Sequence, residues 1–427
     1  MPSRQTQSAL PSSRSRYAAK CVPAAWLAAI ALVPFAACDT PGVTLVDPDI
    51  SNPNDKGTTI HVTLADSALA EALGWSQGVP NAEVVLHRFV DPFRPDTIYS
   101  DSTGRVYVTD LLPGLYWIGG YRVVTNPEQG AAIRAFGGGL KVDLPATIEL
   151  EMAGDQTGSL VISELHFGGL PPVELDYPWD QYFELYNNSD STIYLDGMLW
   201  GRAFGHSGSA LYTCDELRPF REDPLGLWSV EFHQFPGAGT DYPVAPGQLV
   251  TVAMDAVDHS VAHPALPDLS RADFELTGTA DPDNPDVPNM ASVGLGSNLL
   301  GHGMWMSRVM FLAQAVDVTS LLIATVTGGG RWARIPADQI VDVVHSETVK
   351  LNSAPPLMAQ YYCHTWVNRA FDRLDALFYR SGDSDNITSL HRRVLQYTTD
   401  GRPILQDVNA SFVDFSVATL SPGRIEF

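Results

Sequence analysis

Carboxylate and imidazole side chains that could perform acid–base chemistry occur in three segments of the sequence. Glu164 and His166 lie in one apolar segment that reads as a strand, Glu184 lies in the next such segment, and His233 follows further along. A hydrolase would need two carboxylates and a histidine in one cleft, so Glu164 or Glu184 with His166 or His233 is the candidate set. Both glutamates occupy strand positions that need no catalytic explanation. We therefore predict no catalytic residue and keep a hydrolase as the less favoured alternative.

Two further groups have the residue types of metal sites without the spacing of one. His259 and His263 are four residues apart, but Pro264 follows at once and argues against a helix that would align the rings. The aspartates of residues 281–286 alternate with prolines and lack the glycine and glutamate of an EF-hand. Residues 382–386 form a second acidic turn. We expect solvated loop histidines, turn-forming aspartates, no metal and no cofactor; a weak calcium site in either acidic stretch is the alternative.

Composition limits the class of protein. The chain has 427 residues, enough for two or three domains, and 45% of them are hydrophobic. Its 35 glycines and 31 prolines favour a turn-rich β architecture. There are 49 acidic and 26 basic residues, a net charge of −23. Because nucleic-acid affinity comes mostly from lysine and arginine, we expect no nucleic-acid partner.

The first 37 residues have the order of an export signal. Four basic residues and no acidic one precede an apolar run at 22–37, which is too short and too rich in proline for a stable membrane span. The run ends Phe35-Ala36-Ala37-Cys38 and resembles the bacterial lipobox. That resemblance implies a signal peptide over residues 1–37 and lipidation of Cys38, with ordinary cleavage as the alternative. We expect a lipid-anchored protein of the bacterial cell envelope, located at the outer membrane. Because Asp39 follows the cysteine, the inner membrane is the alternative location.

The chain has four cysteines. Cys21 would leave with the signal, and Cys38 is the expected lipid site. Because the compartment outside the inner membrane is oxidising, the remaining Cys214 and Cys363 predict a disulfide, with two buried thiols as the alternative. No C-x-x-C spacing is present, which argues against a structural zinc or redox motif.

Strand and turn patterns follow a tether. Residues 38–57 are rich in Pro, Asp and Asn, and residues 58–152 alternate short strands with turns. Within them, "PNAEVVL" at 80–86, "DSTGRVYV" at 101–108 and "LPGLYW" at 112–117 appear in order. They resemble the motifs of the carboxypeptidase-regulatory-like, prealbumin-like β-sandwich family. The resemblance implies a spacer or binding module without catalytic residues.

A second unit follows a short hinge and is predicted over residues 159–427. It contains "ISE", "FELYNNSD" and "IYLDG" near its start, then "VAPGQLVTVA", "QIVDVV" and "SLHRR". These segments resemble the lamin-tail-like, immunoglobulin-type β-sandwich, and "DPDNPDVPNM" resembles a bacterial lipoprotein family of unknown function built on that domain. Long insertions near 201–240 and 255–335 distinguish this chain, and such insertions on a sandwich often carry binding function.

Taken together, these patterns predict an all-β protein with two tandem β-sandwiches and little helix. Residues 367–378 could form one amphipathic helix or an irregular loop. The expected role is non-catalytic: a binding or assembly module held to the membrane by its lipid. An outer-membrane transporter, a polysaccharide or a peptide is the expected partner. A structural spacer in a surface assembly is the alternative.

Overall fold

The computed structural model describes residues 57–88, 96–109, 111–124, 134–155, 159–168, 179–203, 214–276, 283–295, 309–325, 330–350, 367–374, 376–380 and 388–425. Strands dominate these residues, and the helices are short. The predicted all-β class is confirmed. All described residues belong to one compact unit, Val43–Phe427. Among them, none of the helices has the length and apolarity that a bilayer crossing requires.

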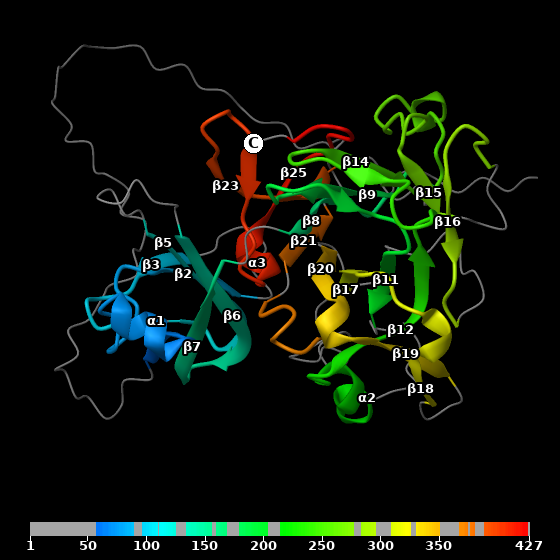
Figure 1. Cartoon of the computed structure of the whole chain (residues 1–427). Helices are drawn as coiled ribbons and strands as arrows, with labels where there is room; N and C mark the ends of the chain where they lie inside the picture. The colour runs from blue at the N-terminus through cyan, green and yellow to red at the C-terminus, as the bar shows by residue number, and fades with distance from the viewer. Residues whose placement is uncertain are drawn as a thin grey trace, which may run out of the picture. The chain divides into compact units, whose positions relative to one another are not determined.

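The first sheet has seven strands in the order β3-β2-β5-β6-β7-β1-β4 (Figure 1). Its β7 joins β6 through only two residue pairs and then continues parallel to β1, so the strands form two layers joined at one end. Apolar side chains of both layers fill the space between them, among them Ile60, Ile118 and Leu150. The elements are β1 (Thr58–Leu64), α1 (Ser67–Ala72), β2 (Glu83–Arg88), β3 (Asp96–Tyr99), β4 (Arg105–Val108), β5 (Gly114–Val124), β6 (Arg134–Leu144) and β7 (Thr147–Gly154).

The second sheet has fourteen strands. The elements of the chain from residue 160 to residue 261 are β8 (Leu160–His166), β9 (Tyr182–Asn187), β10 (Ile193–Tyr194), β11 (Leu199–Ala203), α2 (Cys214–Arg221), β12 (Gly226–Gln234), β13 (Pro243–Val244), β14 (Leu249–Ala253) and the 3-10 turn η1 (His259–Val261). The elements that follow are β15 (Phe274–Leu276), β16 (Asn289–Ser292), β17 (Val309–Ala313), η2 (Val318–Ser320), β18 (Leu322–Thr325), β19 (Arg331–Pro336), η3 (Ala337–Gln339), β20 (Ile340–Lys350), β21 (Ala376–Arg380), β22 (Thr388–Arg392), β23 (Val394–Tyr397), β24 (Pro403–Leu405), α3 (Ser411–Asp414) and β25 (Phe415–Thr419).

The order along this sheet is β21-β20-β17-β11-β12-β16-β15-β14-β9-β8-β22-β25, with β19 and β18 branching from β12; β10 with β13 and β23 with β24 form separate pairs. The sheet curls on itself, because side chains from strands far apart in this order share one core, for example Leu165, Phe183 and Leu312. The two predicted insertions contribute strands to it, including β12 and β15 to β19. The helical alternative for 367–378 is wrong, since residues 367–374 form turns and β21 begins at Ala376.

Glycines of β5 and β6 receive side chains from the C-terminal part of the chain. A Cβ atom at Gly137 would lie 2.3 Å from Val408 Cγ2, and one at Gly119 would lie 2.5 Å from the ring of Phe412. Both distances are shorter than real Cβ contacts, so any larger residue at these two positions would force the neighbouring side chain to shift. The contacts continue through a hydrogen bond from the Asp407 amide to Asp155 Oδ1 at 3.0 Å.

Candidate functional site

A bulge in β8 sets the arrangement of the candidate site. The pairing of β8 with β9 shifts between Ile162 and Glu164, leaving Ser163 as the extra residue. Before the bulge the even-numbered Ile162 faces the core, and after it the odd-numbered Leu165 does. The carboxylate of Glu164 therefore lies on the face away from that core, because a bulge reverses the alternation of side chains.

Four strands then align polar side chains in one row. Glu164 is directly opposite Glu184 of β9, Glu184 is opposite Thr251 of β14, and His391 of β22 is opposite Glu164 on its other side. Side chains directly opposite each other in antiparallel strands lie within contact distance. The row thus contains two of the predicted acid–base residues and a histidine that the sequence analysis did not single out.

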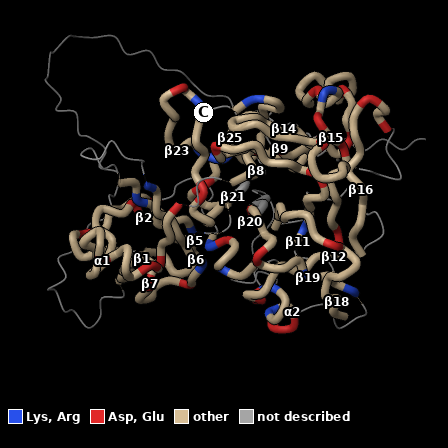
Figure 2. Tube along the Cα trace, viewed as in Figure 1, with Lys and Arg blue, Asp and Glu red and all other residues tan. Residues whose placement is uncertain are grey.

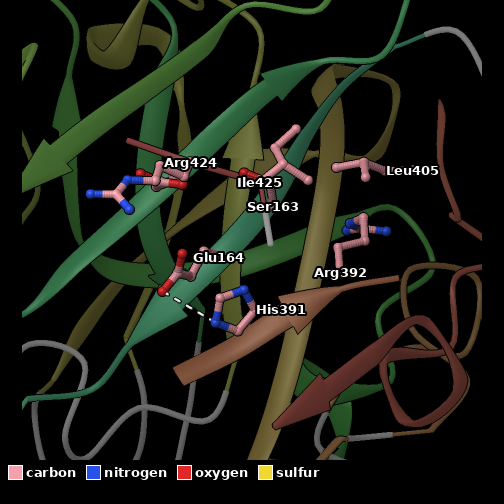
Figure 3. Close-up of a pocket in the computed structure, with 8 residues that line it drawn as sticks. Ser163, Glu164, His391, Arg392, Leu405, Arg424 and Ile425 are labelled. Carbon is pink, nitrogen blue, oxygen red and sulfur yellow. Dashed lines mark ion pairs between the residues drawn. The ribbon is translucent and has the colours of Figure 1, made fainter. Parts of the chain in front are cut away.

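The Glu164 carboxylate accepts hydrogen bonds from several neighbours. Its Oε1 accepts from the Tyr182 hydroxyl, from Ser389 Oγ at 2.6 Å and from the Ser421 amide at 3.1 Å, and its Oε2 accepts from Ser421 Oγ at 3.1 Å. His391 Nε2 lies 3.4 Å from Oε1 (Figure 3). Glu164 is 1% exposed. A buried carboxylate with this many donors acts as a structural acceptor that ties β8, β9 and β22 together.

The serine and histidine of this cluster are close enough to share a hydrogen bond. Ser389 Oγ lies 2.8 Å from His391 Nε2. The single Ser389 hydroxyl proton lies within donating distance of both Glu164 Oε1 and His391 Nε2. The hydroxyl therefore bridges Glu164 and His391 within the row.

Glu184 is the second carboxylate of the row and has a strongly raised pKa. Its Oε1 accepts from Thr251 Oγ1 at 2.8 Å and from the Gly423 amide. Burial, followed by the neighbouring charge of Glu164, raises the pKa of Glu184 to about 8. At neutral pH the Glu184 carboxyl is therefore mostly protonated, because a second charge beside Glu164 in a dry environment is unfavourable.

The space beside the pair is too small for a substrate. The cavity is lined by Ser163, Glu164, Glu184, His391, Arg392, Leu405, Arg424 and Ile425 (Figure 3), and its volume is about 10 Å³. That is room for about one water molecule. Ser163 Oγ is buried at this cavity without a hydrogen-bond partner among the described residues. A water here would have polar partners, whereas a sugar ring or a peptide would not fit.

The two histidines proposed with these glutamates lie elsewhere. His166 Nε2 is 3.0 Å from Asp180 Oδ2, and its Nδ1 is 3.2 Å from the carbonyl oxygen of Thr388. His233 lies in β12, opposite Trp200 of β11. Burial lowers the pKa of His233 to about 4, so it is neutral at pH 7. The structure thus brings Glu164 and Glu184 together and supplies His391 in place of the predicted histidines.

A second polar cluster lies next to the first. Arg392 donates to the carbonyl oxygens of Ile162 at 2.7 Å and Gln406 at 3.0 Å, and to Asp342 Oδ2 at 2.5 Å. Its Nη1 is also 3.3 Å from Asp407 Oδ1. Burial raises the pKa of Asp342 to about 6 even though the Arg392 charge opposes that shift. The sequence analysis did not identify this cluster, because its members are far apart in the chain.

The histidines and aspartates weighed as metal ligands do not converge among the described residues, where no group of three His, Cys, Asp or Glu side chains could hold a metal ion. The expectation of solvated histidines is wrong for His259, which is 1% exposed with Nε2 at 3.0 Å from the Asp255 carbonyl oxygen. His263 is exposed as expected. Asp283 accepts from Asn289 Nδ2 at 2.6 Å. Residues 281, 282 and 382–386 lie outside the described part of the chain.

Acidic residues lie on both sheets, whereas the cysteine side chains fall outside the described part of the chain. Figure 2 shows acidic residues near α2, β7 and β15, so the negative charge is distributed over both sheets. Cys38 and Cys363 lie outside the described residues, and of Cys214 only the backbone, at the start of α2, is described. The lipid site and the disulfide therefore stay predictions.

Comparison with known proteins gives a partial family match. The family described as a protein of unknown function (DUF4876) matches residues 245–421. No curated protein matches the chain. The chain is similar to the crystal structure of a DUF4876 family protein from Bacteroides thetaiotaomicron, with 17% identity and a TM-score of 0.46, over 84% of this chain and 94% of that one. A DUF3823 family protein from Parabacteroides merdae has 10% identity and a TM-score of 0.16, over 47% of this chain and 82% of that one. The matched family has no assigned function.

Proposed function

We propose that the chain is a non-catalytic cell-envelope protein, anchored by a lipid on Cys38, that acts as a binding or assembly module. The non-catalytic role is supported by the hydrogen bonds that the candidate acid–base side chains make. Glu164, Glu184 and His391 bond to neighbouring strands around a cavity for about one water. Groups engaged in this way stabilise the sheet, and a polymeric substrate does not reach them.

The N-terminal residues support the anchor. Residues 1–37 have the basic, apolar and small-residue order of a signal that ends before Cys38. A chain with a net charge of −23 has no attraction to an anionic membrane surface. Two or more acyl chains would supply the attachment, because each buried methylene contributes about 0.8 kcal/mol. We propose the outer membrane as the location, with residues 38–57 as the tether.

The segments predicted as insertions are the proposed recognition elements. They include exposed apolar side chains: Leu225, in the turn before β12, is 62% exposed, and Leu322 and Ile323 of β18 are 52% and 38% exposed. Both β12 and β18 pair with β19. Exposed apolar side chains of this kind suit the binding of a peptide, a polysaccharide or a membrane partner such as an outer-membrane transporter. We further propose that the first sheet is a carboxypeptidase-regulatory-like domain and the second a lamin-tail-like domain. A structural spacer in a surface assembly is the second candidate role.

Metabolic labelling with a palmitate analogue tests the anchor. We expect the wild-type chain to carry the label in its own cells and Cys38→Ser to lose it. Cys21→Ser is the matched control, because Cys21 precedes the predicted cleavage site, and it should label like the wild type. Wild-type protein that takes no label would refute the lipid anchor.

Chemical cross-linking followed by mass spectrometry tests the binding role. We expect the anchored protein to capture a membrane protein or an envelope polymer, and Leu322→Asp with Ile323→Asp to weaken that capture. A spacer would keep its partners in the double variant. Hydrolysis of envelope glycans or peptides that is lost in Glu164→Gln would overturn the non-catalytic proposal.

A further inference from the structure

We propose that residues 421–425 form a pH-sensitive latch that is closed over the Glu164–Glu184 pair at neutral pH and opens in alkaline solution. This inference concerns a conformational device and does not depend on the anchor or on the partner proposed above. It rests on the contacts of the latch, on the way the latch joins the sheet and on the geometry of the carboxylate pair.

The latch is held by three donors aimed at the two carboxylates. The Ser421 amide and hydroxyl bond to Glu164, and the Gly423 amide bonds to Glu184. The segment is a tight turn, closed by a 3.0 Å hydrogen bond from the Arg424 amide to the Ser421 carbonyl oxygen. Gly423 has φ of +78°, a backbone conformation that favours glycine. The latch therefore places its backbone donors directly over the pair.

The latch can leave without breaking the central strands. It follows β25, which pairs with β22 alone among the described residues and is the end strand of the sheet. Its other contacts include the Ser421 amide, 3.2 Å from the Tyr182 hydroxyl, and Ile425, which packs partly against Val161, Tyr186 and Leu405. A segment at the end of a sheet with few apolar contacts opens at a lower free-energy cost than the strands it covers.

The pair responds to pH because its two carboxylates are direct cross-strand neighbours in a buried site. The charged and titratable groups around Glu184 are Glu164 of β8, Tyr182 of β9, Asp273 before β15, His391 and Arg392 of β22 and Arg424 of the latch. Ionisation of Glu184 puts two negative charges side by side, which is unfavourable until water reaches them. Opening the latch admits that water.

Linkage fixes the direction of the response. Burial and the Glu164 charge raise the pKa of Glu184 to about 8 when the latch is closed, against 4.5 for a glutamate in water. The open form binds the Glu184 proton less tightly, so rising pH favours opening. Burial and Glu164 also raise the pKa of Tyr182 well above 10, so this tyrosine stays neutral through the change.

Hydrogen exchange of the full chain tests the latch. Exchange rates of the amides in residues 421–425 are measured at pH 6.5 and pH 9.5 and divided by the intrinsic rates at each pH. Linkage between pKa values of about 8 and about 4.5 predicts that protection falls about 30-fold over this interval and levels off above about pH 8. Protection that is equal at the two pH values would overturn the proposal.

Three variants isolate the carboxylate pair. Glu184→Gln cannot ionise, so its latch should show no fall in protection with pH. Asp155→Asn removes another carboxyl whose pKa burial raises, to about 6, and it should keep the wild-type fall. Gly423→Ala meets no atom within 4 Å and strains only the turn, so it should reduce protection already at pH 6.5. If protection of the latch amides falls equally with pH in the wild type and in Glu184→Gln, a group other than Glu184 causes the effect and the proposal is overturned.

Discussion

Among the described residues, one buried polar cluster joins four segments of the chain, and Arg392 is its only cation. It contacts Asp342 of β20, Asp407 after β24, and the carbonyl oxygens of Ile162 and Gln406. The side chains of Arg392 and Asp342 are each 1% exposed. Replacing Arg392 by methionine keeps much of the volume but leaves these carboxylates without their counter-ion. Removal of one partner of a buried ion pair costs about 3–5 kcal/mol, and we expect that loss for Arg392→Met at pH 8.

The loss should depend on pH in a defined direction. Arg392 opposes the rise in the pKa of Asp342, so the pKa of this aspartate in the folded variant will be higher than its present value of about 6. A raised pKa means that the folded state binds the proton more tightly than the unfolded state. The variant therefore recovers stability as the pH falls, and its deficit should be smaller at pH 5 than at pH 8.

Urea unfolding followed by tryptophan fluorescence measures these free energies. Arg393→Met is the matched control, because Arg393 is exposed and makes one long hydrogen bond, of 3.3 Å, to the Phe415 carbonyl oxygen. We expect the control to lose less than about 1 kcal/mol. If Arg392→Met does not fold, Arg392→Lys, which keeps the charge, takes its place in the same unfolding measurement. A deficit for Arg392→Met equal to that of the control, or unchanged between pH 5 and pH 8, would refute the reasoning.

Two further changes test the carboxylate pair and the glycine contacts. The pKa of Glu184, about 8, exceeds the 4.5 of the unfolded chain, so wild-type stability falls between these pH values. Because glutamine does not titrate, Glu184→Gln should gain up to about 4 kcal/mol over the wild type between pH 5 and pH 8, and a pH-independent difference in urea unfolding would contradict this. Gly137→Ala would place a Cβ 2.3 Å from Val408 and should cost about 1–3 kcal/mol. Its control, Gly154→Ala, would meet Phe136 at 3.6 Å; thermal unfolding that finds equal losses for the two would contradict the clash.

Strand alternation and turn residues were sufficient to predict the class of fold. In β1 the residues Thr58, Ile60, Val62 and Leu64 are buried and those between them are less so, as period-two alternation requires. Likewise, the large share of glycine and proline indicated a turn-rich β chain. These signals are local, because each depends only on neighbours a few residues apart.

The histidine partner and the arginine cluster could not be predicted in the same way. Glu164 and His391 are 227 positions apart, and they meet because β22 pairs with β8 in one particular register. A shift of that register by one residue would turn His391 to the other face. The bulge at Ser163 has a similar effect, since without it Glu164 would point into the apolar core. No local pattern in the sequence specifies either.

By itself the sequence determined the acidic charge and the all-β class of the fold, and it predicts the lipid site at Cys38. Those properties follow from residue type and short spacing. Only the tertiary structure decided that Glu184 lies buried beside Glu164 with a pKa raised to about 8, that His391 lies within hydrogen-bond distance of Ser389, and that residues 421–425 bond to both carboxylates. The physical reason is that burial and the identity of a neighbour set the charge and the hydrogen bonds of a polar side chain, and both depend on long-range strand pairing.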